Sequence, residues 1–402
     1  MLAAPPTPKG LQTRERILKA AGAVFWKTGY GASGVADICA AAELAVGGFY
    51  RYFAGKEAVL EALVADLEAE LSREVGTLPE RKELRDEIEA IAGLYFRFVE
   101  KHKEAYQVMR EAEFVCERAS RKFYDSFAAA VGARLAGHGA ARADNEAPVY
   151  SLIGMLSFVA VRNLIWRKRP VPKRAVSDAA DVFVGGVSGL RPDFRALVGK
   201  AVKLRKLRPA AKREPDTAAR LLASAETVFG KKGYGTAHIS EIAARAGYAA
   251  GTFYTCYDSK RDALGRLVLA LRDELVSKAV EYSTGAASRT ETEVMAFLAL
   301  FDFISEHPYG YKIMREAEFV DFRLAEDFYI YILNAYTDRM RATARPGEFV
   351  INDYAALSLM MMGIGHMLGF KYALLKDKGP GPEEMKDMLR SVFSGFDKTK
   401  ND

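Results

Sequence analysis

The chain has 402 residues, of which 50% are hydrophobic and 27% are charged. It is therefore long enough to bury two or more cores, and it is too apolar to be disordered. Its three cysteines and five histidines do not cluster, which excludes metal-knuckle and redox-pair spacings and fits a reducing compartment. We expect a cytoplasmic protein that holds no metal and no cofactor.

The first predicted element is a packing helix. Residues 1–10 lack the apolar stretch of a signal peptide, so we expect them to form a disordered lead. From Thr13 to Lys27 the apolar residues recur on one helical face, and Gly29 is expected to end this helix.

Two short helices and a longer one are predicted to follow. Ser33 is a candidate N-cap for a helix that ends near Ala42. A tight turn then leads into a helix over residues 46–52, and Lys56 opens the next, longer helix. Two short helices joined by a turn behind a packing helix form a helix-turn-helix.

The same pattern occurs twice in the chain. Residues Phe25–Lys56 align with Phe229–Lys260 without a gap at a spacing of 204. The string YQVMREAEFV from Tyr106 returns as YKIMREAEFV from Tyr311, with eight identities in ten at a spacing of 205. The chain is thus predicted to contain two copies of one protein of roughly 200 residues, which is not the short period of a solenoid.

The duplication predicts an all-α chain of two similar units, each a helix-turn-helix headpiece followed by a helical domain. The expected boundaries are a lead at 1–10, a first headpiece at 11–56, a first ligand-binding and dimerisation domain at 57–190, a linker at 191–215, a second headpiece at 216–260 and a second ligand-binding and dimerisation domain at 261–402.

The expected linker carries most of the chain's charge. Residues 191–215 hold nine basic and two acidic side chains, whereas the whole chain carries a formal charge of +6. A basic block on a nearly neutral body indicates either a polyanion nearby or a solvated linker.

One segment is almost long enough to span a membrane. Residues Tyr354–Leu375 are apolar except for three side chains, but the corresponding Tyr150–Trp166 is interrupted by Arg162 and Asn163. We therefore expect a buried core helix and no membrane association.

The third helix of each headpiece is the expected reader of DNA. Small residues such as Gly47 and Gly48 let a helix approach the major groove closely, and polar neighbours can bond to base edges. Tyr50 and Lys56 are placed to reach phosphates at the groove edge.

These residues resemble the N-terminal DNA-binding domain of the TetR/AcrR family of transcriptional regulators. The resemblance rests on Phe25, Gly29-Tyr30, Asp37-Ile38, Gly47 to Phe53 and Lys56-Glu57, and on their counterparts from Phe229 to Arg261. It implies homodimer-like assembly through the last two long helices of each ligand-binding domain. It also implies DNA contacts by Ser33, Val46, Gly47, Gly48, Tyr50, Arg51, Tyr52, Lys56, Ala250, Gly251, Thr252, Tyr254, Thr255, Cys256 and Lys260.

The repeated REAEF element has two open interpretations. One is an aromatic-lined pocket with an arginine and a glutamate as polar anchors. The other is an internal salt bridge that ties the headpiece to the ligand-binding domain. The candidate ligand-binding residues are Tyr106, Arg110, Glu113, Phe114, Tyr124, Tyr311, Arg315, Glu318, Phe319 and Tyr329.

The sequence favours a repressor that binds a double-stranded DNA operator and is released by a small apolar or aromatic effector. An architectural or co-regulator DNA-binding protein with vestigial pockets is the alternative, and nothing clusters as an enzyme site would. We expect an intramolecular pseudo-dimer, with the helix that follows each headpiece as the lever. The operator should be an imperfect palindrome, since Gly48, Arg51 and Tyr52 of one reader have different counterparts in the other, unless one reader is inactive.

Overall fold

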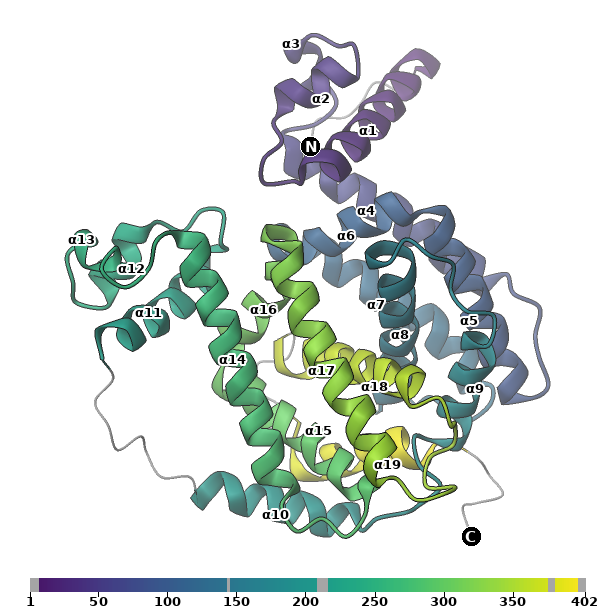
Figure 1. Cartoon of the computed structure of the whole chain (residues 1–402). Helices are drawn as coiled ribbons and strands as arrows, with labels where there is room; N and C mark the ends of the chain where they lie inside the picture. Colours follow the sequence, from purple (N-terminus) through teal and green to yellow (C-terminus); the bar gives the residue numbers. More distant parts are fainter. Residues whose placement is uncertain (1–6, 143–144, 208–215, 375–379, 397–402) are drawn as a thin grey trace.

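The protein is all-α, as predicted. The computed structural model describes residues 7–142, 145–207, 216–374 and 380–396, and within these ranges it has nineteen α-helices, two short π-helical segments and no strand. The helices form a central body from which two headpieces project as separate lobes, one from each half of the chain (Figure 1).

The first unit begins with the headpiece helices and ends with the helices of the central body. Its elements are α1 (Pro8–Thr28), α2 (Val35–Ala41), α3 (Val46–Phe49), α4 (Lys56–Gly76), α5 (Leu84–Lys101), α6 (Lys103–Val115), α7 (Glu117–Ala136), α8 (Ala147–Ala160) with the π-helical η1 (Val161–Trp166), and α9 (Ala175–Gly185).

The second unit repeats this order after a connecting helix, α10 (Phe194–Leu207). Its elements are α11 (Thr217–Lys232), α12 (Ile239–Arg245), α13 (Ala250–Phe253), α14 (Lys260–Ser283), α15 (Arg289–Glu306), α16 (Pro308–Val320), α17 (Phe322–Thr343), α18 (Tyr354–Gly369) with the π-helical η2 (Phe370–Leu374), and α19 (Pro382–Ser394).

The packing helices begin and end as their sequences direct, with one correction. Gly29 and Gly233 both have φ of +79° and end α1 and α11, which confirms the stop predicted at Gly29. The prediction of disorder through residue 10 is wrong for its last part, because Thr7 caps α1 and Pro8 opens it. Residues 1–6 lie outside the described residues.

The expected basic linker is mostly a helix. α10 packs on α15 and α19, because Phe194, Leu197 and Val198 are buried on one of its faces. The Nζ of Lys200 donates to the carbonyl oxygen of Thr284 at 2.8 Å. Part of the basic block therefore serves packing within the chain; residues 208–215 lie outside the described residues.

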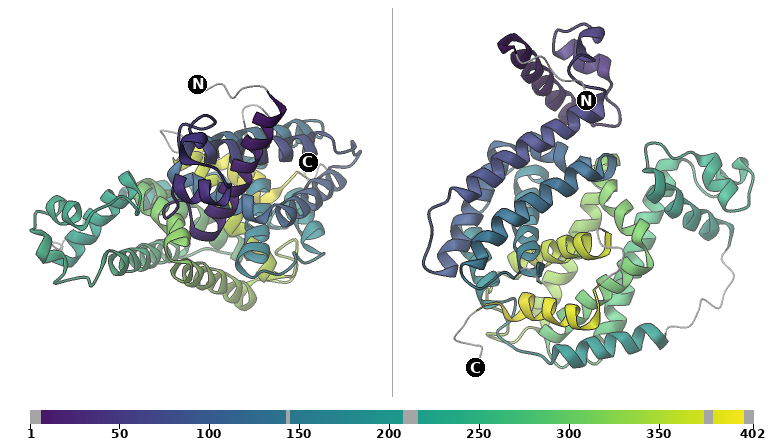
Figure 2. Two further views of the ribbon diagram at one scale, coloured as in Figure 1. Left: turned by 90° about the horizontal axis from the view of Figure 1, so that it is seen from above. Right: turned by 180° about the vertical axis from the view of Figure 1, so that it is seen from behind.

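The two units join through α8 and α18, which cross at a pair of glycines. A Cβ on Gly154 would lie 2.3 Å from the carbonyl oxygen of Gly363, and a Cβ on Gly363 would lie 2.2 Å from that of Gly154. No other residue permits such backbone contact. With α9 against α18 and α19 against α8, these helices form the expected four-helix interface (Figure 2).

This reciprocal contact also corrects the alignment of the two halves. Gly154 matches Gly363, and η1 matches η2, at a spacing of 209. At this spacing the counterparts of Met360–Met362 are Ser151–Ile153, whereas the headpiece spacing of 204 would give Leu156–Phe158. The chain thus gains four residues between the REAEF element and the unit interface of the second copy.

One helix in the described part of the chain is apolar and long enough to cross a membrane, namely Ala147–Trp166 with a mean hydropathy of 1.5. Of this stretch, 89% is buried inside the protein. Its apolar surface faces α18 and its own unit, as in a core helix.

Candidate functional site

Each headpiece holds a short exposed helix on two packing helices. α2 and α3 are joined by a turn in which Glu43 has a φ of +49°, and the matching Gly247 of the second headpiece has a φ of +84°. The buried rings of Phe49 and Phe253 anchor α3 and α13 to the core of each headpiece. The same left-handed turn therefore presents both short helices, although only one copy has a glycine for it.

The helices α3 and α13, together with the turn that follows each, carry most of the residues expected to meet DNA. Tyr50 and Tyr254 are 47% and 60% exposed, high values for large aromatic side chains. A Cβ added to Gly47 or Gly251 would meet nothing within 4 Å, whereas one on Gly48 would lie 3.0 Å from Leu44. Only the first glycine of the pair therefore lies open toward an external surface.

Ser33 does not have the role predicted for it. The N-cap of α2 is Gly34, whose N–H donates to the Asp37 carboxylate at 2.7 Å. Ser33 is 6% exposed and its hydroxyl donates to the carbonyl of Tyr30, so its side chain does not face a ligand. In the second headpiece the N-cap of α12 is His238.

Lys56 and Lys260 bind their own headpieces. The Lys56 ammonium donates to the carbonyl oxygens of Tyr30 and Ser33, both at 2.8 Å, and lies 4.2 Å from the centre of the Tyr30 ring. Lys260 repeats this arrangement around Tyr234. Burial lowers the pKa of both lysines. This geometry replaces the expected phosphate contacts: each lysine closes the turn before the second helix.

A comparison of Lys56→Met with Arg51→Met separates a residue that stabilises the headpiece from one that contacts DNA. Lys56→Met should destabilise the first headpiece by about 1.5–3 kcal/mol, because two hydrogen bonds from a charged donor are lost. It should weaken DNA binding without changing the slope of log K against log salt. Arg51 is exposed on the reader, and Arg51→Met should lower the magnitude of that slope by about 0.9. A salt titration of DNA affinity measures both; equal changes of slope would contradict the assignment.

The headpieces are held to the body by the second residue of the REAEF element. The Glu111 carboxylate of α6 accepts from the backbone N–H of Tyr30 at 2.9 Å, and Glu316 of α16 accepts from that of Tyr234 at 3.0 Å. Burial raises the pKa of both carboxyls. REAEF does tie the headpiece to the body, but not through the predicted salt bridge: the tie is a hydrogen bond to Glu111 or Glu316, residues that sequence reasoning did not select.

The second headpiece has further contacts of its own. His307 lies between Glu226 of α11 and Glu274 of α14, at 3.1 and 3.2 Å. These two carboxylates raise the pKa of His307 to about 10. A Cβ on Gly230 would lie 2.3 Å from the Cβ of Tyr309, so α11 touches α16 closely. In the first unit the residue at the Gly230 position is Trp26, which is 39% exposed.

His307→Gln should destabilise the second headpiece in a pH-dependent way. The folded-state pKa is raised above the unfolded value of about 6.5, so the stabilisation is complete below pH 6.5 and is lost as pH rises through 10. The difference in unfolding free energy between wild type and variant should therefore shrink between pH 7 and pH 10. Urea unfolding at several pH values measures it, with the exposed His238→Gln as control. A difference that does not change with pH would contradict the double contact.

The arginines and glutamates of REAEF join the two units instead of pairing within one. Arg110 of α6 donates to both carboxylate oxygens of Glu318 on α16, each at 2.6 Å. Arg315 of α16 reciprocally pairs with Glu113 of α6. The Glu318 and Glu113 side chains are only 1% and 4% exposed. These two pairs, here called the reciprocal ion pairs, are related by the pseudo-two-fold axis.

Aromatic rings seal the reciprocal ion pairs. Phe114 and Phe319 meet across the axis with ring centroids 5.6 Å apart, and Trp166 Nε1 donates to Glu318 at 2.8 Å. Tyr124 donates to Glu113. The predicted pairing of arginine with glutamate within one unit is thus corrected: Arg110, Glu113, Phe114, Glu318 and Phe319 form a unit interface.

The second unit contains a cavity of about 880 Å³, counted out to its mouth. It lies between α14, α15, α16, α17 and α18 and is called the second-unit cavity below. Its walls are mainly aliphatic and aromatic, and three of the ten candidate ligand residues, Tyr311, Arg315 and Tyr329, line it. The other wall residues are Phe158, Leu275, Val276, Ala279, Glu293, Ala296, Phe297, Leu300, Met314, Phe328, Ile332, Tyr336, Met361, Met362, Gly365 and His366.

The corresponding space in the first unit is filled by larger side chains. Tyr95 stands where the second unit has Leu300, and its ring stacks on Phe127 with centroids 5.4 Å apart. The Tyr95 hydroxyl also bonds to those of Tyr106 at 2.7 Å and Ser157 at 2.8 Å. Five wall positions are larger in the first unit, and they pair as Val75 with Ala279, Ile91 with Ala296, Tyr95 with Leu300, Phe127 with Ile332, and Leu156 with Gly365. At two other wall positions the second unit has the larger side chain, since Phe297 and Tyr336 correspond to Ala92 and Val131. The Phe297 ring contacts that of Phe393.

The polar wall of the cavity is part of the unit interface. Arg315 donates from Nε to Nε2 of His366 at 2.9 Å, and the Tyr311 hydroxyl donates to the His366 carbonyl at 3.0 Å. Burial and the nearby arginines hold the pKa of His366 well below its usual range, so this imidazole is neutral. A molecule in the cavity would therefore contact the same guanidinium that pairs with Glu113.

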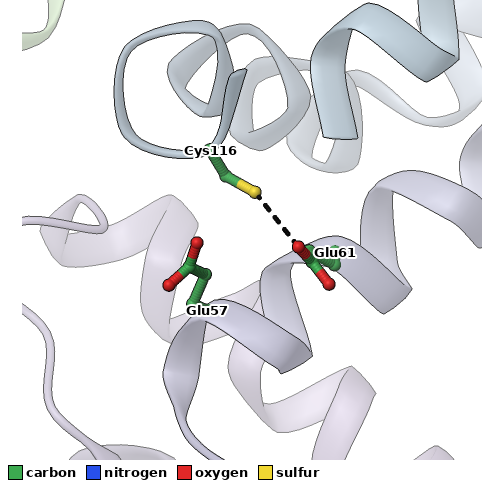
Figure 3. A group of neighbouring side chains, drawn as sticks. All are labelled: Glu57, Glu61 and Cys116. Carbon is green, nitrogen blue, oxygen red and sulfur yellow. Dashed lines mark hydrogen bonds between the residues drawn. The ribbon is translucent and has the colours of Figure 1, made fainter. Parts of the chain in front are cut away.

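Two groups among the described residues each bring three potential metal ligands together. Glu57, Glu61 and Cys116 meet where α4 passes the α6–α7 junction, with the Cys116 sulfur 3.6 Å from a Glu61 oxygen (Figure 3). Arg118 engages Glu61, so ion pairing accounts for this group. In the group of Glu274, Glu306 and His307, both ring nitrogens of the histidine face carboxylates and act as donors.

Comparison with known proteins agrees with these two headpieces. The family described as "Bacterial regulatory proteins, tetR family" matches residues 17–63 and again residues 221–267. The HTH-type transcriptional activator FasR of Mycolicibacterium smegmatis is 34% identical over 103 residues, which span 25% of this chain and 46% of the relative. The chain therefore matches less than half of that curated relative.

One of the solved structures to which this chain is similar is that of a bacterial regulator. It is described as fatty acid degradation regulator FadR from Bacillus halodurans, and it is 16% identical with a TM-score of 0.38. The match covers 95% of that chain and 44% of this one.

Proposed function

We propose that the chain, whose two headpieces each match the tetR family of bacterial regulatory proteins, is a cytoplasmic, non-enzymatic transcriptional regulator built by tandem duplication. It binds operator DNA through both headpieces, and an apolar or aromatic small molecule in the second-unit cavity releases the DNA. The observation that carries this proposal is that one helix, α16, contributes to the cavity, to the attachment of a headpiece and to the unit interface.

The connection runs through adjacent residues of α16. Tyr311, Met314 and Arg315 line the cavity, while the next residue, Glu316, accepts the backbone N–H of Tyr234. At the start of α16 the N–H of Gly310 donates to Glu226 of α11 at 3.1 Å. A ligand that shifts α16 therefore moves the second headpiece directly. This makes α16 a more direct lever than α14, the helix that the sequence favoured.

The same shift reaches the first headpiece through the reciprocal ion pairs. Arg315 holds Glu113 of α6, and Glu111 on that helix accepts the N–H of Tyr30. A ligand bound in one unit can thus change the spacing of both headpieces. Because such coupling requires different affinities for two arrangements, an effector must bind the released arrangement more tightly than the DNA-bound one.

The operator is expected to be an imperfect palindrome. The reader residues differ between the units: Arg51 and Tyr52 of the first occupy the positions of Thr255 and Cys256 in the second. Arginine bonds two acceptors of guanine, whereas threonine contacts several bases weakly. One half-site should therefore be read more stringently than the other.

The experiment begins with selection of bound sequences from random DNA, followed by a screen of apolar and aromatic compounds for release of the selected site. The decisive variant is Ala296→Ile/Leu300→Tyr, which introduces the first unit's residues and fills the cavity. It should bind the operator as the wild type does but no longer respond to the effector. Val280→Ile adds volume on the exposed face of α14 and is the matched control.

Failure of the screen would favour the architectural alternative. In that case no compound would both stabilise the protein against heat and release the DNA. An effector that released the filled variant at the same concentration as the wild type would show that the cavity is not the effector site.

A further inference from the structure

A buried ion pair lies at the outer end of the second-unit cavity. Arg289 and Glu293, one turn apart on α15, are 8% and 1% exposed and pair with each other. Glu293 lines both the cavity and an adjoining outer chamber of about 500 Å³, which Arg289 also lines. The two spaces share Ala296, Ile332 and Tyr336, so a long molecule that occupies both would lie against this pair.

Each partner keeps one polar atom without a partner. The Nε–H of Arg289 and Oε2 of Glu293 are buried and form no hydrogen bond in the structure. Burial raises the pKa of Glu293 to about 7 despite the neighbouring guanidinium. Buried polar atoms that lack partners are destabilising and rare in native proteins. A free donor and a free acceptor therefore border the same apolar space.

The fold itself does not need this ion pair. In the first unit the same two positions of α5 hold Leu84 and Ile88, and there the equivalent cavity space is filled. Replacing a buried ion pair with apolar residues is often neutral or stabilising. The unit with the open cavity is thus the one that keeps a buried charge pair, which indicates a role in recognising what the cavity holds.

We infer that Arg289 and Glu293 form a recognition site for a neutral carboxamide-like group on an otherwise apolar ligand. The inference rests on the proposed effector function of the cavity. A carboxamide offers a carbonyl oxygen to Arg289 Nε–H and an N–H to Glu293 Oε2, which satisfies both atoms. An ester lacks the donor, and a carboxylate brings a second negative charge beside Glu293. The apolar chain then lies in the cavity toward His366, and polar groups beyond the amide reach the outer chamber near Arg339.

The test compares three ligands of one chain length on the full chain: octanamide, methyl octanoate and octanoate at pH 8. Calorimetric titration should show octanamide binding at least about tenfold more tightly than either of the others, because only it pairs both buried atoms. In Arg289→Leu/Glu293→Ile, which carries the first unit's residues, the amide-to-ester ratio should fall to within about twofold while the ester still binds. Glu293→Gln keeps the side-chain shape and should also lower the ratio, so it decides the matter where the double variant does not fold.

The outcomes separate the inference from the function on which it rests. Equal binding of amide and ester by the wild type, or a ratio that the variants leave unchanged, overturns the amide site but leaves the cavity as an effector site. No binding of any of the three ligands overturns both.

Discussion

Arg110→Met should lower the free energy of unfolding by about 3–5 kcal/mol. The substitution leaves the Glu318 carboxylate, whose side chain is 1% exposed, without its bidentate partner. Removing one member of a buried ion pair strands the other charge away from water, and this is among the most destabilising single changes. Because the pair joins the two units, the lost contact should also loosen the headpieces and weaken operator binding.

Chemical unfolding measures the effect, with Arg341→Met as the matched control. Arg341 pairs with Asp338 at the surface, where the two side chains are 63% and 72% exposed, so its loss should change stability by less than about 0.5 kcal/mol. The double variant Arg110→Met/Glu318→Met removes both charges and should recover at least half of the loss. A single variant as stable as the control would contradict the burial of this pair.

Gly154→Ala should be among the most damaging single methyl additions in the described part of the chain. The added Cβ would lie 2.3 Å from the carbonyl oxygen of Gly363, and backbone cannot move aside as a flexible side chain can. The two helices at the centre of the unit interface must then separate, so we expect a loss of about 3 kcal/mol, at the upper end for overpacking.

Gly199→Ala is the control for this change. Gly199 is an exposed residue of α10 with nothing within 4 Å of an added Cβ, so the same substitution should stabilise the chain by about 0.5–1 kcal/mol. Thermal unfolding of both variants measures the contrast. If Gly154→Ala melted within a degree of the wild type, the close crossing of α8 and α18 would be wrong.

The headpieces could be predicted from sequence because their signals are local. Gly29, the Phe-Tyr pair and the turn before α3 act within a few residues, and the second copy repeats them. The exception is instructive: Lys56 is positively charged and near the reader, which suggested phosphate binding. Only the structure shows its ammonium on two carbonyls that lie 23 and 26 residues away.

The role of REAEF could not be predicted, because its partners lie more than 200 residues apart. Arg110 and Glu113 are correctly spaced for pairing within one helix. A duplicated chain also allows each to pair with the opposite copy, and sequence alone does not distinguish the two arrangements. In the structure Arg110 pairs with Glu318, and Glu113 pairs with Arg315, each across the pseudo-two-fold axis.

The location of the cavity was visible in the sequence but only as a difference between its halves. Leu300 and Ala296 of the second unit are smaller than Tyr95 and Ile91, their counterparts in the first, and therefore leave space open. The aromatic residues that the two copies share drew attention to the first unit as well, where they fill the core. The pairing of Leu156 with Gly365 was also hidden, because the spacing between equivalent residues of the two halves has changed to 209 at this point.

The central claim is that one chain does the work of a regulator dimer, and the stoichiometry of the DNA complex tests it most directly. Sedimentation equilibrium of the chain with its selected operator should give one chain of 44.3 kDa per duplex. Hydroxyl-radical footprinting of that same complex should show protection of two unequal half-sites. Two chains per operator, or one chain that protects a single half-site, would contradict the account.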